Sequence, residues 1–100
     1  MDTFAALADP TRRQILELLG EREHSAGDLA RRFRISRPAV SRHLRVLREA
    51  GLAQARGDAQ RRIYRIEAAP LADVDAWIGR YRGFWSGGLD RLEHHLDEGE

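Results

Sequence analysis

The side chains with the clearest capacity for chemistry are the arginines of residues 31 to 65. This block holds 11 of the 17 arginines and two acids, Glu49 and Asp58, a formal net charge of +9 in a chain whose total is +1. The rest of the chain holds six arginines and 14 acids. The complete use of arginine in place of lysine is as compatible with a GC-rich genome as with selection for bidentate contacts. The uneven distribution of charge, rather than the choice of arginine, therefore points to an anionic partner.

No catalytic pattern accompanies these arginines. Ser, His and Asp occur without a nucleophile elbow, a Gly-rich phosphate loop or a paired-carboxylate site, so we expect no enzyme and no cofactor. Cysteine is missing, which excludes disulfides and thiolate metal sites. The composition fits one folded domain over residues 1–100, and no apolar run is long enough to span a bilayer. The N-terminus has no basic start followed by an apolar stretch, so we expect a cytoplasmic protein.

The basic block contains an amphipathic helix at residues 36–51. Val40, Leu44 and Leu47 recur at i, i+4 and i+7 and are expected to face the core. The opposite face carries the polar side chains of Arg37, Ser41, Arg45 and Arg48. Solvated helix faces usually interleave acids for i,i+4 pairing, and here Glu49 stands alone. Because a helix fits the major groove, we interpret this stripe of charge as a surface for DNA.

The residues that flank this helix set its limits. It starts either at Ser36 or, because a residue before proline avoids the helical region, at Arg37 with Pro38 in the first position. Ala50 and Gly51 are expected to end it with a left-handed cap.

Three shorter helices are predicted before residue 36. Residues 2–8 have helical spacing of apolar side chains, and Asp9-Pro10 then supplies an N-cap and a first helical residue. The second helix is expected to end at Gly20. Ser25 and Asp28 resemble a capping box that opens a third helix of about two turns.

A hairpin and a long helix are predicted after residue 51. Residues 52–67 read as two strands joined by a turn at "GDAQ", with β-branched and aromatic residues in the second strand. Apolar residues then keep helical spacing over 70–98. Gly87 and Gly88 are a place where this helix can bend or break.

This order of elements predicts a mainly α fold with a small β-hairpin, the winged helix-turn-helix. The chain also resembles the ArsR/SmtB family of bacterial repressors over nearly its whole length. The resemblance is carried by "LADPTRRQILELL" (7 to 19), "SAGDLARRFRISRPAVSRHLRVLREAGL" (25 to 52) and the hairpin "RGDAQRRIYRI" (56 to 66). It implies a DNA-binding transcriptional repressor whose recognition helix is 36–51 and whose wing is 52–67.

The DNA-binding residues are expected on the recognition helix and the wing. Base contacts are assigned to the positions that match the family's base-contacting stretch, which are Arg37, Pro38, Ser41 and Arg42. His43 and Arg45 are placed nearer the DNA backbone, and Ser36 is first a helix cap and second a phosphate ligand. The wing contributes Arg56, Arg61 and Arg62. For Arg61 and Arg62 an edge strand protected by its charge is the alternative interpretation.

The long terminal helix predicts a homodimer, because its large rings exceed what a core of this size can hide. Together with the helix at 2–8 it supplies the expected interface residues, which are Phe4, Leu7, Trp77, Tyr81, Phe84, Trp85 and Leu89. Members of the family dimerise in this way. Two recognition helices about 34 Å apart, or a multiple of it, would then predict an inverted-repeat operator.

The sequence departs from the metal-sensing members of the family. It lacks their Cys pair. Their terminal-helix site begins with an Asp and a His, and the chain has Asp73 and Asp75 there without the His. His94, His95 and Glu98 lie too far along to complete that spacing, so we expect no metal site. Any small-molecule or protein effector is unknown. The rival interpretation is a winged-helix module that binds another polypeptide and has little specific affinity for DNA.

Overall fold

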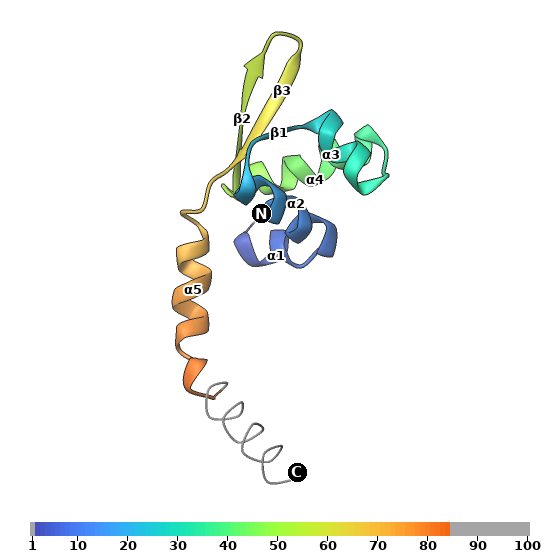
Figure 1. Ribbon diagram of the computed structural model, residues 1–100. Helices are drawn as coiled ribbons and strands as arrows, with labels where there is room; N and C mark the ends of the chain where they lie inside the picture. The colour runs from blue at the N-terminus through green and yellow to red at the C-terminus, as the bar shows by residue number, and fades with distance from the viewer. Residues whose placement is uncertain (1, 85–100) are drawn as a thin grey trace, which may run out of the picture.

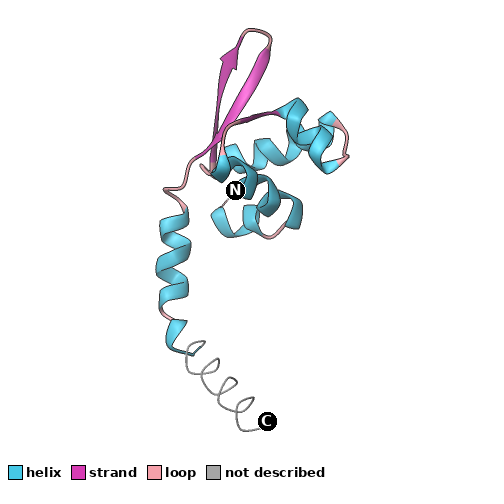
Figure 2. Ribbon diagram, in the orientation of Figure 1, coloured by secondary structure: helices cyan, strands magenta, loops and turns pink. Residues whose placement is uncertain are grey.

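The computed structural model describes residues 2–84, in which four helices surround a small core, a three-stranded sheet projects from it and a fifth helix leads away (Figure 1). The helices are α1 (Thr3–Leu7), α2 (Pro10–Glu21), α3 (Ala26–Phe33), α4 (Arg37–Glu49) and α5 (Leu71–Gly79). The strands are β1 (His24–Ser25), β2 (Ala53–Asp58) and β3 (Arg61–Ile66). The hairpin of β2 and β3 leaves the helical body at one end and α5 leads away from it at the other (Figure 2). The predicted fold class, mainly α with a small hairpin, is confirmed.

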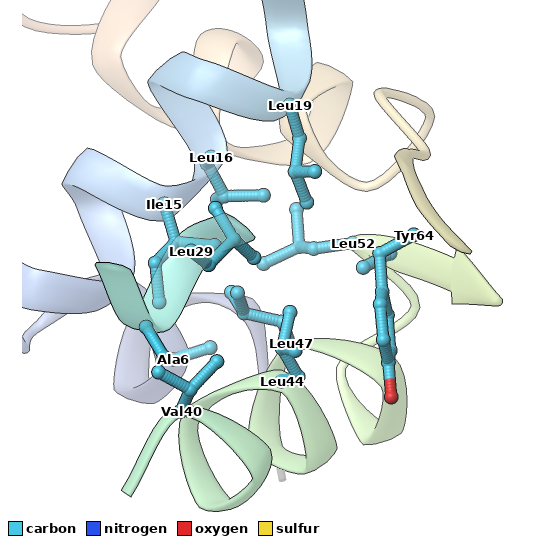
Figure 3. Packing of buried hydrophobic residues seen from close by; sticks show 12 residues of the cluster. Ala6, Ile15, Leu16, Leu19, Leu29, Val40, Leu44, Leu47, Leu52 and Tyr64 are labelled. Carbon is cyan, nitrogen blue, oxygen red and sulfur yellow. The ribbon is translucent and has the colours of Figure 1, made fainter. Parts of the chain in front are cut away.

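The core lies where α2, α3 and α4 meet. Val40, Leu44 and Leu47 are fully buried on one side of α4, as their spacing predicted. They face the apolar stripe of α2, where Ile15 and Leu16 are buried (Figure 3). Because this side of α4 is buried, the opposite side points away from the core.

Side-chain caps define where the helices begin. The carboxylates of Asp2 and Asp9 accept from the backbone N–H of Ala5 (2.7 Å) and Arg12 (3.0 Å). The hydroxyls of Ser25 and Ser36 accept from Asp28 (3.1 Å) and Ala39 (3.2 Å) at the starts of α3 and α4. Of the two starts considered for α4, the structure has Ser36 as the N-cap, with Arg37 as the first helical residue. Gly51 has the expected positive φ, 76°.

The sheet contains a strand that the sequence does not predict. β1 pairs with β3 in the order β1-β3-β2, with His24 opposite Tyr64 and Ser25 opposite Ile63. A two-residue strand is too short to show a period in the sequence. The hairpin turn is also tighter than predicted, because the ladder extends to the pair Asp58 and Arg61 and leaves only Ala59 and Gln60 unpaired.

His24 is the one buried side chain whose polar atoms lack partners among residues 2–84. It is 2% exposed, and neither ring nitrogen has a hydrogen-bond partner within that range. Burial lowers the pKa of His24 below its ordinary value, and the positive charges of Arg22 and Arg32 lower it further, against the opposing effect of Asp28. The folded protein therefore holds this imidazole neutral.

Two helix ends differ from the prediction. α2 continues one residue past Gly20 to Glu21. The helix predicted over 70–98 is interrupted: α5 ends at Gly79, the N–H groups of Arg80 and Tyr81 bond three residues back, and residues 82–84 are helical again. Gly79 lacks a side chain that would stabilise the helical conformation, which favours this early end. The break considered at Gly87 and Gly88 lies outside the described residues. In the described part of the chain, no helix has the length and apolar character to cross a membrane.

Candidate nucleic-acid interface

The outward face of α4 carries the residues that were predicted to read DNA. Ser36, Arg37, Pro38, Ser41, Arg42 and Arg45 are all exposed. Val40, Leu44 and Leu47 on the same helix are fully buried. This face is therefore available to a ligand as large as a DNA duplex.

An open groove of about 400 Å³ lies between α3, α4 and the wing, and four of its 11 lining residues are arginines. Its charged lining residues are Asp28, Arg31, Arg37, Arg61 and Arg62. Nη1 of Arg31 and Cζ of Arg37 come within 3.8 and 3.9 Å of the point that a Cβ on Gly27 would occupy. Two guanidinium groups thus converge on one place, an arrangement that a bound anion would stabilise.

The acids near these arginines form only exposed ion pairs. Arg31 pairs with Asp28, and Arg61 with Asp58 at 3.6 Å. Hydrogen bonding from Ser25 is the main cause that lowers the pKa of Asp28, so its carboxylate stays charged at neutral pH. Exposed pairs of this kind are screened by solvent and contribute little, so a phosphate can replace the carboxylates at small cost.

The three wing arginines that were predicted to contact DNA differ in their surroundings. Cross-strand partners share a face of a sheet, and the register places Arg56 beside Ile63, on the face opposite to Tyr64. There Arg56 pairs with Glu23 at 2.9 Å. Arg62 lies two residues from Tyr64 on β3, shares its face, lines the groove, and has no ion pair within residues 2–84. Arg61 and Arg62 therefore lie in the groove with the recognition helix, whereas Arg56 does not.

His43 is half-buried and turned toward α2, unlike the exposed arginines of α4. Its Nδ1 lies 3.4 Å from Nη1 of Arg12. The carboxylate of Asp9 is close to this pair, and its pKa is lowered first by the hydrogen bond from the backbone N–H of Arg12. The prediction that His43 lies near the DNA backbone stays a prediction, and the structure adds a contact within the protein.

Two arginines of this region were not predicted. Arg31 follows Asp28 by three residues, a spacing that indicates a local ion pair on a helix. The spacing therefore gives no sign that Arg31 lines the groove. Arg12 belongs to α2 and reaches His43 across 31 positions of sequence. Only the excess of charge in residues 31 to 65 could have drawn attention to Arg31.

A second exposed surface, the aromatic face, joins α1 to α5. It consists of Phe4, Trp77, Tyr81 and Phe84, which are 41 to 75% exposed. Their rings form a row in which each ring lies edge-on or tilted against the next, with centroids 5.6, 5.2 and 6.3 Å apart. α5 itself has no buried residue. Of the other residues predicted at a dimer interface, Leu7 packs partly against the core, and Trp85 and Leu89 lie outside the described residues.

A polar helix facing outward from a helical body, beside an antiparallel hairpin and a cationic groove, defines a winged helix DNA-binding regulator. Residues 9–55 match the family described as bacterial regulatory protein, arsR family. The chain is 38% identical over 77 residues to the transcriptional repressor SdpR of Bacillus subtilis, covering 77% of this chain and 86% of that protein. It is 41% identical over 94 residues to the HTH-type transcriptional regulator Rv2034 of Mycobacterium tuberculosis, covering 94% of this chain and 85% of that protein.

A solved structure agrees with the sequence relatives. The crystal structure of a possible transcriptional regulator for arsenical resistance superposes with a TM-score of 0.74 at 42% identity, covering 92% of this chain and 93% of that chain. The protein belongs to the arsR family of bacterial transcription regulators. The predicted resemblance to the ArsR/SmtB family is confirmed.

Proposed function

We propose that the protein is a homodimeric repressor that binds an inverted-repeat operator through α4 and the wing. The observation that carries this proposal is the groove in which arginines of α3, α4 and β3 meet beside the exposed face of α4. Similarity to SdpR, named a transcriptional repressor, supports repression as the outcome of binding.

The dimensions of α4 suit the major groove. An α-helix with its side chains is about 10–12 Å across, and the B-DNA major groove is about 12 Å wide. The first turns of α4 then carry Arg37, Ser41 and Arg42 to base edges. A phosphate of the adjoining backbone enters the groove between Arg37, Arg31 and Arg62, so that the wing and the recognition helix hold the same stretch of DNA.

The aromatic face supports a two-fold dimer. α5 has no buried residue, and the four rings of the aromatic face are exposed. A second copy of the chain would cover this apolar surface. Two-fold pairing would place two copies of α4 about one DNA turn apart, ~34 Å, or a multiple of it. Light scattering at micromolar concentration tests this directly, and the mass of a single chain would contradict it.

We also propose that repression is relieved without a metal and that the protein acts in the cytoplasm. The chain has no cysteine, and no group of three His, Asp or Glu side chains in residues 2–84 could hold an ion. His94, His95 and Glu98 lie outside the described residues. A tenfold change in operator affinity on titration with stoichiometric zinc or nickel would overturn the metal-free proposal.

A binding assay with DNA from upstream of the protein's own gene tests the whole proposal. The expected result is a shift that weakens steeply as salt is raised, because each neutralised phosphate releases condensed counterions. A protein that gives no salt-sensitive shift with this DNA, or with a library of random duplexes, would instead be a module that binds another polypeptide.

A further inference from the structure

Arg12 connects two helices that have different expected tasks. Its guanidinium donates from Nε to the carbonyl oxygen of Ala6 at 2.7 Å and from Nη2 to that of Ala5 at 3.2 Å. These carbonyls belong to the last turn of α1, and that of Ala5 also accepts from the N–H of Ala8. The third guanidinium nitrogen, Nη1, lies 3.4 Å from Nδ1 of His43 on α4. One planar group thus contacts both α1 and the recognition helix.

The chemistry of the two groups sets which ring nitrogen of a neutral His43 carries the proton. A guanidinium has only donors, so in this contact Nδ1 of His43 is the acceptor. In the neutral imidazole the proton is then on Nε2. That leaves the Nε2–H as a donor, the form in which His43 can bond to a phosphate oxygen of DNA.

α1 also takes part in the aromatic face. Phe4 on α1 packs edge-to-face against Trp77 of α5, with ring centroids 5.6 Å apart. The route from this face to α4 runs through the carbonyls of Ala5 and Ala6 and then through Arg12. A displacement of α1 moves two of the three groups that hold this guanidinium.

We infer that Arg12 is a positioning residue that fixes the tautomer and orientation of His43 and couples the recognition helix to α1 and the aromatic face. The consequence for operator binding rests on the proposed function, whereas the tautomer does not. The simpler interpretation is that Arg12 only caps the end of α1.

Arg13 provides the matched control. It caps the same end of α1, donating from Nη1 to the carbonyl oxygens of Leu7 (2.8 Å) and Ala8 (3.3 Å). Both of these bonds go to α1, so Arg13→Met removes capping of α1 alone. Arg12→Met removes a similar cap together with the contact to His43, and methionine keeps most of the aliphatic stem in both variants.

The first measurement needs no DNA. Long-range ¹H–¹⁵N spectra of the histidine rings in the full chain, above pH 7.5, report the tautomer of His43, with His43→Phe identifying its signals. We expect the Nε2–H tautomer in the wild type and in Arg13→Met, and a mixture of both tautomers in Arg12→Met. The same tautomer ratio in all three proteins would overturn the inference.

The second measurement is operator affinity by fluorescence anisotropy, with urea unfolding run in parallel to confirm that each variant folds. Coupling through a packed network is worth about 0.5 to 2 kcal/mol, so Arg12→Met should weaken binding about twofold to thirtyfold and Arg13→Met by less than twofold. The double variant Arg12→Met/His43→Phe should bind no worse than the weaker single variant. Additive effects, or equal losses for Arg12→Met and Arg13→Met, would show that Arg12 acts only as a cap. If the wild type binds no DNA while the tautomer result holds, the proposed function fails and the Arg12–His43 contact stands.

Discussion

Replacement of Trp77 by alanine tests whether the aromatic face is a dimer interface. Trp77 is 47% exposed in the single chain. A tryptophan buries up to about 250 Å², so about 120 Å² of it remains for a partner to cover. At about 25 cal/mol per Å² this area contributes about 3 kcal/mol per chain, and a symmetric dimer contains two copies. If the partner covers only half of each ring, Trp77→Ala still costs about 3 kcal/mol of dimer stability, a rise in the dissociation constant of more than a hundredfold.

Sedimentation equilibrium across a range of concentrations measures this change. Trp77→Phe is the matched control, since it keeps an aromatic ring against Phe4 and Tyr81 and should change the dissociation constant far less. Circular dichroism of both variants checks that the fold persists, which is expected because no residue of α5 belongs to the buried core. The reasoning is refuted if Trp77→Ala dimerises as tightly as the wild type.

Three further predictions concern the interface and the fold. Arg42→Ala should cost about 1 to 3 kcal/mol of operator affinity and relax base preference at one position per half-site, whereas Arg62→Ala should weaken binding to all sequences alike. Binding to single-base operator variants and to random DNA separates the two, and equal loss of specific and random binding in both variants would contradict this division of roles. Folding lowers the pKa of His24, so the unfolded chain takes up a proton at this residue before the folded one does. The free energy of unfolding is therefore unaffected by His24 above the ordinary histidine pKa of about 6.5, and it falls as the pH drops below that value, by at most about 1.4 kcal/mol per pH unit. Urea unfolding from pH 7.5 to 5.0 should show a shallower loss for His24→Leu, and parallel curves would contradict this. Ser36→Ala should lower the free energy of unfolding by about 1 kcal/mol, since it removes the hydroxyl that caps α4, and an unchanged urea midpoint would count against that cap.

The local features of the fold could be predicted because short-range chemistry determines them. Asp9, Ser25 and Ser36 are side chains that accept a hydrogen bond from a backbone three residues ahead, a pattern visible in the sequence. The buried face of α4 follows from the period of Val40 and Leu44 in the same way. The strand β1 could not be predicted, because it exists only by pairing with β3, almost 40 residues later.

The candidate site was predictable in its residue types and less so in its geometry. The exposed face of α4 follows from periodicity, and the structure agrees with the exposure of Arg37, Ser41 and Arg42. The sequence could not show that Arg56 pairs with Glu23, because the two residues are 33 positions apart and meet only in the folded chain. For the same reason it missed Arg12, whose partner lies on another helix.

The salt dependence of operator affinity tests the central claim most directly, which is that arginines of α3, α4 and the wing face one DNA backbone together. With about six to ten phosphate contacts in a dimer, the slope of log affinity against log salt should lie between about −5 and −9. The double variant Arg31→Ala/Arg62→Ala removes four of these contacts from a dimer and should reduce the slope by about 3 to 4. A wild-type slope shallower than about −2, or a double variant whose slope is unchanged, would contradict the account.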